Sequence, residues 1–372
     1  AYESQVSPRV GPIYVDSAAT GGGDGGSWST AYNDLQDALA VLQPGDSIWV
    51  AKGTYFPDGG NGDNLVSFDI TVPCHVLGGF EGVETHASQR DWQVNRTILN
   101  GDLGGDDERV GDTVVNTEDN SESIFEIRSE EGCVLDGFEI AGATQFGLLI
   151  SASGSDLQAV ELFNLIVRDN FFTRDPGGGV EVDNPSHIRM EQVAFSNNHG
   201  APALSVFQSD PAGRIHMELR DCSFEGNTSP VVAGGAIRWH SNGSLRIHNS
   251  TFVSNTAETG AALMALLYHM VDYIDIQVSN CLFVGNTAAV TGGAICLADN
   301  MVCEIVNSTF SNNQAIEGGD VLRAETATQV NTRNSIIWNN GPIPNNAVSI
   351  EVADVSFAFS DIQGSGGSSA WD

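Results

Sequence analysis

A glycine-rich stretch of the sequence carries five acidic side chains within eleven residues: Asp102, Asp106, Asp107, Glu108 and Asp112. Carboxylate oxygens are the ligands that Ca²⁺ prefers, and glycines between them let the backbone wrap around an ion. The spacing is not that of an EF-hand, and a solvated acidic loop is the alternative. We therefore predict a calcium site here, and a weaker second one at Asp58, Asn61 and Asp63.

Three further residues are candidates for catalysis: Arg238, His240 and, more weakly, Lys52, the one lysine of the chain. A polysaccharide lyase needs a base that abstracts the proton beside a uronate carboxylate, and a cation that stabilises the enolate. Arg238, Trp239 and His240 offer a base, a stacking surface and a titratable ring. The alternative is that they only alternate between the two faces of a strand. Lys52 is expected to pack its stem over Trp49 or Tyr55.

A repeat sets the elements that must position these residues. Seven asparagines recur at intervals of 27 to 31 residues: Asn170, Asn198, Asn227, Asn255, Asn286, Asn313 and Asn340. An apolar residue, most often phenylalanine, stands three positions before each asparagine, and a glycine-rich element followed by small apolar residues lies between most of them. A fixed period of this length indicates a stacked solenoid.

The strand content of each repeat predicts an all-β fold, a right-handed parallel β-helix with roughly 27–31 residues per rung. A leucine-rich horseshoe is disfavoured because segments such as 307–313 lack leucines. We expect the asparagines to occupy left-handed corners and to bond their amides to neighbouring rungs, as a structural ladder rather than a ligand site. The phenylalanines should stack inside. A second column contains Asn249, Asn280, Asn307 and Asn334, with Asp221 in the same slot.

The chain is predicted to form one continuous domain with three parts. Residues 1–80 should contain a cap and the first rungs, including a helix that Ser29 or Thr30 caps and that covers the exposed first rung. Residues 81–130 interrupt the rhythm and are predicted to be an acidic loop insertion. Residues 131–372 should form regular rungs.

The charge of the chain bounds its partners and surroundings. The formal net charge is −33, which repels nucleic acid and anionic membranes and suits salty or calcium-rich surroundings. No apolar run approaches the roughly 18 residues that span a bilayer. The chain opens at Ala1 without a signal peptide, which suits an exported protein whose leader was removed. We therefore expect an extracellular or cell-surface protein that binds no nucleic acid and does not insert into membranes.

The six cysteines match no zinc spacing. Cys222 and Cys281 hold the same place in their repeats but are two rungs apart, about 9.6 Å, which is too far for a disulfide. They should be buried free thiols. Two other pairs are candidates for disulfides: Cys74 with Cys133, and Cys296 with Cys303.

The repeats carry a resemblance to a known class of proteins. The alternation of Phe-x-x-Asn with Gly-Gly-Ala-Ile or Gly-Ala-Ala-Leu resembles the repeats of polymorphic outer-membrane proteins. The blocks at 13–16, 34–39 and 45–55, with 78–82 and 90–97, are similar to the start of a broad family of exported bacterial β-helix proteins. The resemblance implies an exported or surface-anchored β-helix, often adhesive, and implies no reaction. The chain departs from that family by ending at Asp372 without an anchor or barrel.

These observations favour a non-catalytic extracellular scaffold, either an adhesin or a unit that assembles head to tail. The second version rests on the strand-like segments 348–352 and 357–359, which nothing afterwards covers. Expected partners are further copies of the chain, or cell-surface glycans or proteins. The alternative is a calcium-assisted polysaccharide lyase or glycoside hydrolase. A polygalacturonase-type site is disfavoured, because His199-Gly200 and Asp106-Asp107 stand in the wrong order for that family.

Overall fold

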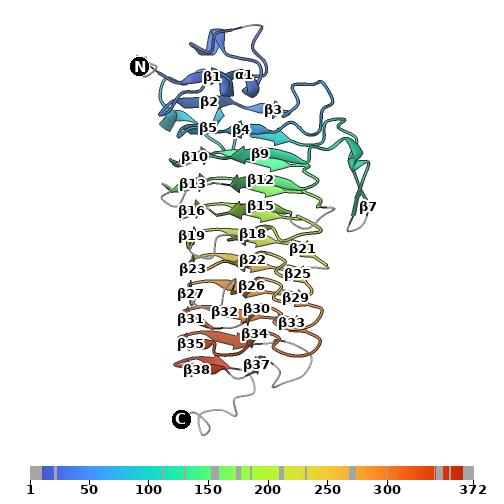
Figure 1. The fold of residues 1–372 in the computed structure, drawn as a ribbon, viewed down its shortest axis with the longest axis vertical. Helices are drawn as coiled ribbons and strands as arrows, with labels where there is room; N and C mark the ends of the chain where they lie inside the picture. Colours follow the sequence, from blue (N-terminus) through green and yellow to red (C-terminus); the bar gives the residue numbers. More distant parts are fainter. Residues whose placement is uncertain are drawn as a thin grey trace.

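The chain winds into a long stack of parallel strands, with the N-terminus at one end and the C-terminal residues at the other (Figure 1). The structure is a computed structural model and describes residues 11–20, 23–110, 113–129, 131–151, 159–172, 177–184, 187–208, 213–230, 233–267, 274–298, 300–338, 340, 347–351 and 353–362. Three long sheets, here named A, B and C, run the length of the stack. The predicted all-β solenoid is therefore confirmed.

Each sheet takes one strand from each rung. In spatial order, sheet A contains β1 (Ile13–Val15), β2 (Ser47–Ala51), β5 (His75–Phe80), β10 (Cys133–Asp136), β13 (Val160–Phe163), β16 (His187–Glu191), β19 (Ile215–Arg220), β23 (Gly243–His248), β27 (Ile274–Ser279), β31 (Met301–Val306), β35 (Gln329–Arg333) and β38 (Asp354–Ala358). Sheet B contains β3 (Gly53–Tyr55), β6 (Thr97–Asn100), β11 (Phe138–Ala141), β14 (Ile166–Arg168), β17 (Ala194–Ser196), β20 (Ser223–Glu225), β24 (Thr251–Val253), β28 (Leu282–Val284), β32 (Thr309–Ser311), β36 (Ile336–Trp338) and β39 (Asp361–Ile362).

Sheet C closes the rung, and a short fourth sheet lies between B and C. Sheet C contains β4 (Phe68–Ile70), β9 (Ser123–Ile127), β12 (Phe146–Ser151), β15 (Gly178–Asp183), β18 (Leu204–Phe207), β22 (Ile237–His240), β26 (Leu263–Leu266), β30 (Ile295–Ala298), β34 (Leu322–Ala324) and β37 (Val348–Ile350). The short sheet contains β21 (Thr228–Ser229), β25 (Thr256–Ala257), β29 (Thr287–Ala288) and β33 (Gln314–Ala315).

In the core, residues of the same type from successive rungs stack on one another. Phe195, Phe224, Phe252, Phe283 and Phe310 follow one another in register on sheet B, and each is at most 1% exposed. Consecutive rings are 4.6–4.9 Å apart and lie within 6° of parallel. Burying one such side chain contributes roughly 1.5–3 kcal/mol. The predicted aromatic stack is confirmed.

The predicted asparagine ladder is also present, with one correction. In six successive pairs the ladder amide Nδ2 donates to Oδ1 of the next ladder asparagine at 2.9–3.0 Å, and the same oxygen accepts the backbone N–H. The left-handed backbone, however, belongs to the residue before each of the first six ladder members, for example Asn197 (φ 55°) and Ser254 (φ 54°). The ladder asparagines face inward, whereas the second column, such as Asn249 (φ 52°), does adopt the left-handed conformation.

The N-terminal region differs in detail from its prediction. The helix α1 (Leu35–Leu39) is a single short turn capped by Asp34, whose carboxylate accepts from the Gln36 N–H at 2.9 Å. Ser29 and Thr30 lie instead in a separate 3₁₀ turn, η1 (Trp28–Thr30). That α1 covers the first rung stays a prediction. Among the described residues no helix is long and apolar enough to cross a membrane.

The segment 81–130 was predicted to be a loop, and this was too broad. It contains η2 (Ala87–Gln89) and the strands β6 and β9, which belong to sheets B and C because Leu99 and Ile124 enter the core. The antiparallel hairpin of β7 (Glu108–Val110) and β8 (Thr113–Val115), followed by η3 (Thr117–Asp119), projects from the solenoid (Figure 1).

All six cysteines are buried and free. Cys74 and Cys133 are neighbours across one rung, as expected, but their sulfurs are 3.8 Å apart and form a hydrogen bond, not a disulfide. Cys296 and Cys303 were wrongly predicted as a possible pair, because Cys303 enters the main core while Cys296 packs in a separate cluster outside sheet C. Burial raises the pKa of the Cys303 thiol to about 12.

Replacing Cys222 with serine is expected to change the free energy of unfolding by less than about 1 kcal/mol. Its slot is filled by Ser250 one rung later, whose hydroxyl donates to the His248 carbonyl at 2.8 Å and accepts the Cys222 N–H at 3.1 Å. Cys303→Ser places a hydroxyl in the apolar core and should cost about 1–3 kcal/mol. Chemical denaturation of both variants measures the two changes in the free energy of unfolding. Equal losses of stability would contradict the claim that the position of Cys222 accepts a serine.

Candidate metal centre

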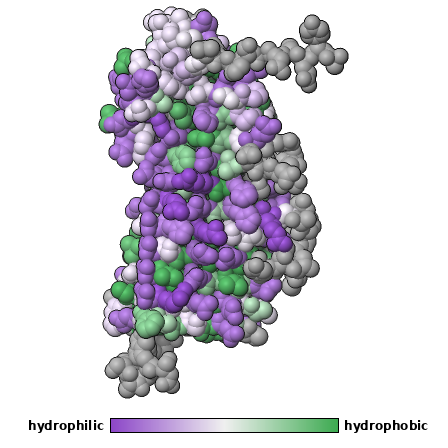
Figure 2. Space-filling view, turned by 90° about the vertical axis from the view of Figure 1, so that its left-hand side faces the viewer, coloured by the Kyte–Doolittle hydropathy of each residue, from purple (hydrophilic) through white to green (hydrophobic). Residues whose placement is uncertain are grey.

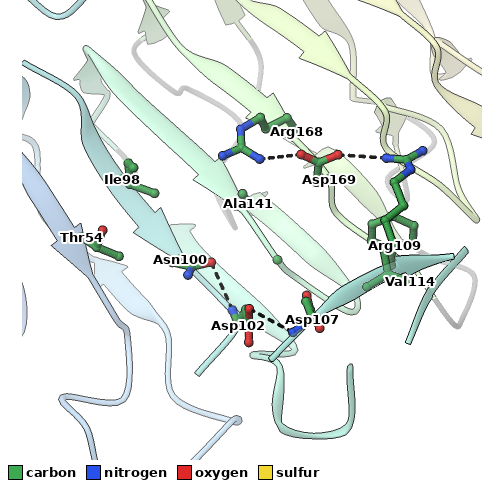
Figure 3. A pocket seen from close by; sticks show the side chains of 12 residues that line it. Thr54, Ile98, Asn100, Asp102, Asp107, Arg109, Val114, Ala141, Arg168 and Asp169 are labelled. Atoms are coloured by element: carbon green, nitrogen blue, oxygen red, sulfur yellow. Dashed lines mark hydrogen bonds and ion pairs between the residues drawn. The ribbon is translucent and has the colours of Figure 1, made fainter. Parts of the chain in front are cut away.

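A pocket of about 380 Å³ lies on the outer face of sheet B beneath the β7–β8 hairpin (Figure 3). Strands β3, β6, β11 and β14 provide one wall, and the loop and hairpin that follow β6 provide the other. The pocket is lined by Thr54, Ile98, Asn100, Asp102, Asp107, Arg109, Val114, Ala141, Gly142, Arg168, Asp169 and Phe171. Acidic and basic side chains therefore face one another across it.

Three of the predicted calcium ligands gather at the edge of this pocket. One carboxylate oxygen from each of Asp102, Asp106 and Asp107 lies within 4.8 Å of the others. Asp102 shapes the loop: its carboxylate accepts from the N–H of Gly105 at 2.7 Å, of Asp106 at 3.2 Å and of Asp107 at 3.4 Å. The backbone thereby folds around the first carboxylate and brings the other two beside it.

Asp107 is the member of this cluster under most electrostatic strain. Its Oδ2 accepts from the Asn120 amide at 2.9 Å, whereas its Oδ1 is buried without a hydrogen-bond partner. Burial raises the pKa of Asp107 to about 6, helped by the charges of Asp102, Asp119 and Asp106 and opposed by the Asn120 hydrogen bond. A divalent cation at this cluster would bind the unpartnered oxygen and offset the repulsion. The donor set is thus suited to Ca²⁺.

In the absence of Ca²⁺, the free energy of unfolding should fall as the pH rises from about 4 to about 6. The pKa of Asp107 is higher in the folded protein than the ordinary 3.8, so in this window the folded state binds the extra proton. Deprotonation at higher pH then destabilises the fold. Asp107→Asn should lose this slope. Denaturation at about pH 4.5 and about pH 6.5 in EDTA measures it, and equal slopes in both proteins would contradict this account.

The remaining predicted ligands do not join the cluster. Glu108 begins β7, is exposed and is not among the residues whose oxygens gather there. Asp112 lies outside the described residues. At the weaker site, Asp58, Asn61 and Asp63 accept backbone N–H groups of their own turns at 2.7–3.1 Å, and calcium binding there stays a prediction.

A chain of arginines and carboxylates links β14 to the hairpin across the pocket. Arg168 pairs with Glu139 and, at 2.5 Å, with Asp169, which also pairs with Arg109 at 3.1 Å (Figure 3). Burial opposes the charge of Arg168, but these hydrogen bonds and ion pairs outweigh it and raise its pKa. Arg168 therefore stays protonated, so it contributes a positive charge to the pocket and does not act as a base.

The catalytic candidates lie elsewhere. Arg238 and His240 line a separate pocket of about 530 Å³ on the outer face of sheet C, as alternating strand residues. Trp239 is fully buried and donates its ring N–H to the Ser241 carbonyl, so it offers no stacking surface. Burial and the charge of Arg238 lower the pKa of His240. Lys52 is in neither pocket and pairs with Glu81 at 2.5 Å.

Two carboxylates of this second pocket were missed from the sequence. Both stand on β15, two strands away from β22 in sheet C. Across the intervening strand β18, Glu181 is in register with Arg238, and Asp183 is in register with His240. Burial raises the pKa of Asp183. Aligning the repeats rung by rung would have shown these columns.

The comparisons with known proteins agree with the fold. Residues 113–269 match the family described as a right-handed β-helix region. The chain is a right-handed β-helix repeat protein. A metabotropic glutamate receptor-like protein R of Dictyostelium discoideum is 28% identical over 151 residues, which are 37% of this chain. The chain spans only 9% of that protein's length.

Two solved β-helix structures are similar to this one. The pectate lyase Pel9A aligns over 95% of this chain and 80% of its own, at 11% identity and a TM-score of 0.51. A rhamnogalacturonan lyase aligns over 94% of this chain and 87% of its own, at 12% identity and a TM-score of 0.44. At such identities the pectate lyase likeness concerns the fold alone. The resemblance to polymorphic outer-membrane proteins stays a prediction.

Proposed function

We propose that this β-helix is a non-catalytic extracellular scaffold that binds Ca²⁺ at Asp102, Asp106 and Asp107 and, through the ion, a cell-surface glycan. The observation that carries the proposal is the close approach of three carboxylates, one of which, Asp107, has a buried Oδ1 without a hydrogen-bond partner. A net charge of −33 further supports surroundings rich in divalent cations.

A glycan is proposed as the partner because the carboxylate cluster leaves part of the Ca²⁺ coordination shell unfilled. Ca²⁺ takes roughly six to eight oxygen ligands, and three carboxylates at a pocket edge supply only part of that shell. Hydroxyl and carboxylate oxygens of a sugar can complete it. Arg109 on the hairpin and Arg168 on β14 then offer donors to a uronate carboxylate. The pectate lyase of similar fold acts on such a polysaccharide, which supports this ligand class.

Binding of oligogalacturonate tests this proposal. We expect binding in millimolar Ca²⁺, none in EDTA, and a loss in Asp107→Asn, which removes one ligand charge. Glu108→Gln is the matched control, since it removes an equal charge beside the cluster. Binding that is equally strong in EDTA would contradict the proposed calcium bridge.

Assembly of copies head to tail is part of the same proposal. Within the described residues, sheets A, B and C end at β38, β39 and β37, whose outer edges lack a strand partner. Such edges are templates for a further strand. Sedimentation velocity over a range of concentrations tests it, and a single monomer boundary throughout would count against assembly.

A polysaccharide-cleaving enzyme at the same pocket is the second candidate, and one observation favours it. Asp107, with a pKa of about 6, is suited to act as a general acid. The two functions oppose each other, because an Asp107 that binds Ca²⁺ is ionised. A panel of polysaccharides, assayed for unsaturated products and reducing ends with and without Ca²⁺, separates them. Cleavage that Ca²⁺ abolishes and Asp107→Asn removes would favour the enzyme.

A further inference from the structure

The outer face of sheet A carries a column of polar side chains from four consecutive rungs. His187, His216, Ser244 and Asp275 follow one another in register on β16, β19, β23 and β27. The two imidazole rings are 5.1 Å apart, and the His216 Nδ1 lies 2.8 Å from the Ser244 Oγ. Adjacent strands are about 4.8 Å apart, so the column extends about 14 Å along the solenoid axis.

This column forms part of a groove of about 470 Å³ whose charge is opposite to that of the chain. Arg214 and Arg246 also line the groove, and Asp275 is the one acidic residue in its lining. The whole chain has 15 basic against 48 acidic residues. Figure 2 shows that this side of the molecule is mostly hydrophilic. The groove is therefore a local concentration of positive charge on an acidic protein.

Arg246 is positioned to bind an external anion. It is exposed and forms no ion pair with any described residue. Its register neighbour Glu218 pairs instead with Arg220, at 2.5 Å, and the hydrogen bonds and charge of Arg220 lower the pKa of that carboxyl. An arginine left in this state can donate two parallel hydrogen bonds to a carboxylate or sulfate.

We propose that this groove binds the anionic groups of a short oligosaccharide segment, through Arg246, Arg214 and the His187–His216 pair. The proposal is independent of the calcium function, because the groove is on sheet A and the carboxylate cluster is in the loop that follows β6 and covers sheet B. The volume lies in the range of ligand pockets. No Phe, Tyr or Trp among the described residues lines the groove, and the net charge repels a long polyanion, so nucleic acid is disfavoured.

His216 makes this site dependent on pH. His216 faces His187 and Arg189 from β16, Ser244 and Arg246 from β23, and Asp275 beyond them, with Arg214 and Glu218 next to it in its own segment. Burial, together with the charges of His187, Arg246 and Arg214, lowers the pKa of His216. The ring is therefore neutral at pH 7. A bound anion favours the protonated ring, so affinity should rise as the pH falls.

Fluorescence anisotropy with labelled tetrasaccharides in EDTA tests the proposal. The three probes are a heparin-derived tetrasaccharide, tetragalacturonate and neutral maltotetraose, each at about pH 5.5 and about pH 7.5. We expect at least one anionic probe to bind about fivefold or more tightly at the lower pH, and maltotetraose not to bind. Arg246→Gln should weaken binding about tenfold, and His216→Asn should reduce the pH dependence.

Two variants on the same sheet control for net charge and for histidine content. Arg333→Gln removes an equal charge outside the groove, and His75→Asn removes an exposed histidine several rungs away. Both should bind as the parent protein does. Binding of the heparin fragment alone assigns sulfate as the ligand group, and binding of tetragalacturonate alone assigns carboxylate. Equal loss in Arg246→Gln and Arg333→Gln, equal binding of maltotetraose, or no binding in EDTA would overturn the proposal.

Discussion

Asp107→Asn is expected to weaken Ca²⁺ binding at least about tenfold, measured by isothermal titration calorimetry. Asparagine keeps an oxygen ligand but removes one of the three negative charges that attract the ion. The Asp107 carboxylate is suited to bind the ion, because its Oδ1 is buried without a hydrogen-bond partner and its pKa is raised to about 6. Below that pH a proton competes with Ca²⁺ for the same oxygen, so affinity should fall as the solution is acidified through about pH 6.

Glu108→Gln separates a true site from general attraction to an acidic surface. Glu108 is the next residue along the chain, yet it begins β7 and lies outside the cluster. Its replacement should leave the affinity within about twofold of the parent, since exposed charges interact only weakly through water. Similar losses in the two variants would indicate nonspecific screening, and the absence of any binding heat in the parent would refute the site.

Phe252→Ala should lower the free energy of unfolding by about 3–5 kcal/mol. Phe252 is fully buried between Phe224 and Phe283, with ring centroids at 4.9 Å and 4.7 Å. Removing the ring leaves a cavity with stacked rings on both sides. The neighbouring Asn286 amide also donates to the Phe252 carbonyl, so relaxation of the strand would disturb the ladder. The cavity is therefore expected to persist rather than collapse.

Urea denaturation of Phe252→Ala beside Phe359→Ala measures this effect. Phe359 is 87% exposed and should change stability by less than about 0.5 kcal/mol. In a solenoid the rungs interact mainly with their neighbours, so the loss could also split the transition into two steps. A cost below about 1 kcal/mol for Phe252→Ala would contradict the importance of the aromatic stack.

The repeating core could be predicted from the sequence because every rung fills the same interior positions. A phenylalanine at a fixed offset from an inward asparagine stacks on its copy one rung away, and this shows directly as a period. The left-handed corner was assigned one residue too late. Several residue types fill it, including Asn197, Gly226 and Ser254, so it leaves no uniform column in the sequence.

The sites were less predictable because they depend on neighbours across rungs. The carboxylate density around Asp102 was visible, but the β7–β8 hairpin that carries Glu108 is not part of the repeat. The Gly111-Asp112 pair between its strands favours a two-residue hairpin and was missed. The sheet A groove needs His187, His216 and Ser244 aligned across turns of unequal length. Without that register the three residues read as unrelated surface positions.

Anomalous X-ray diffraction from crystals grown with Ca²⁺, or with a lanthanide in its place, tests the central claim most directly. The account predicts a peak bonded to carboxylate oxygens of Asp102, Asp106 and Asp107 at about 2.3–2.6 Å, and its loss in crystals of Asp107→Asn. A map with full ion occupancy at other acidic surfaces and no peak at these three residues would contradict it.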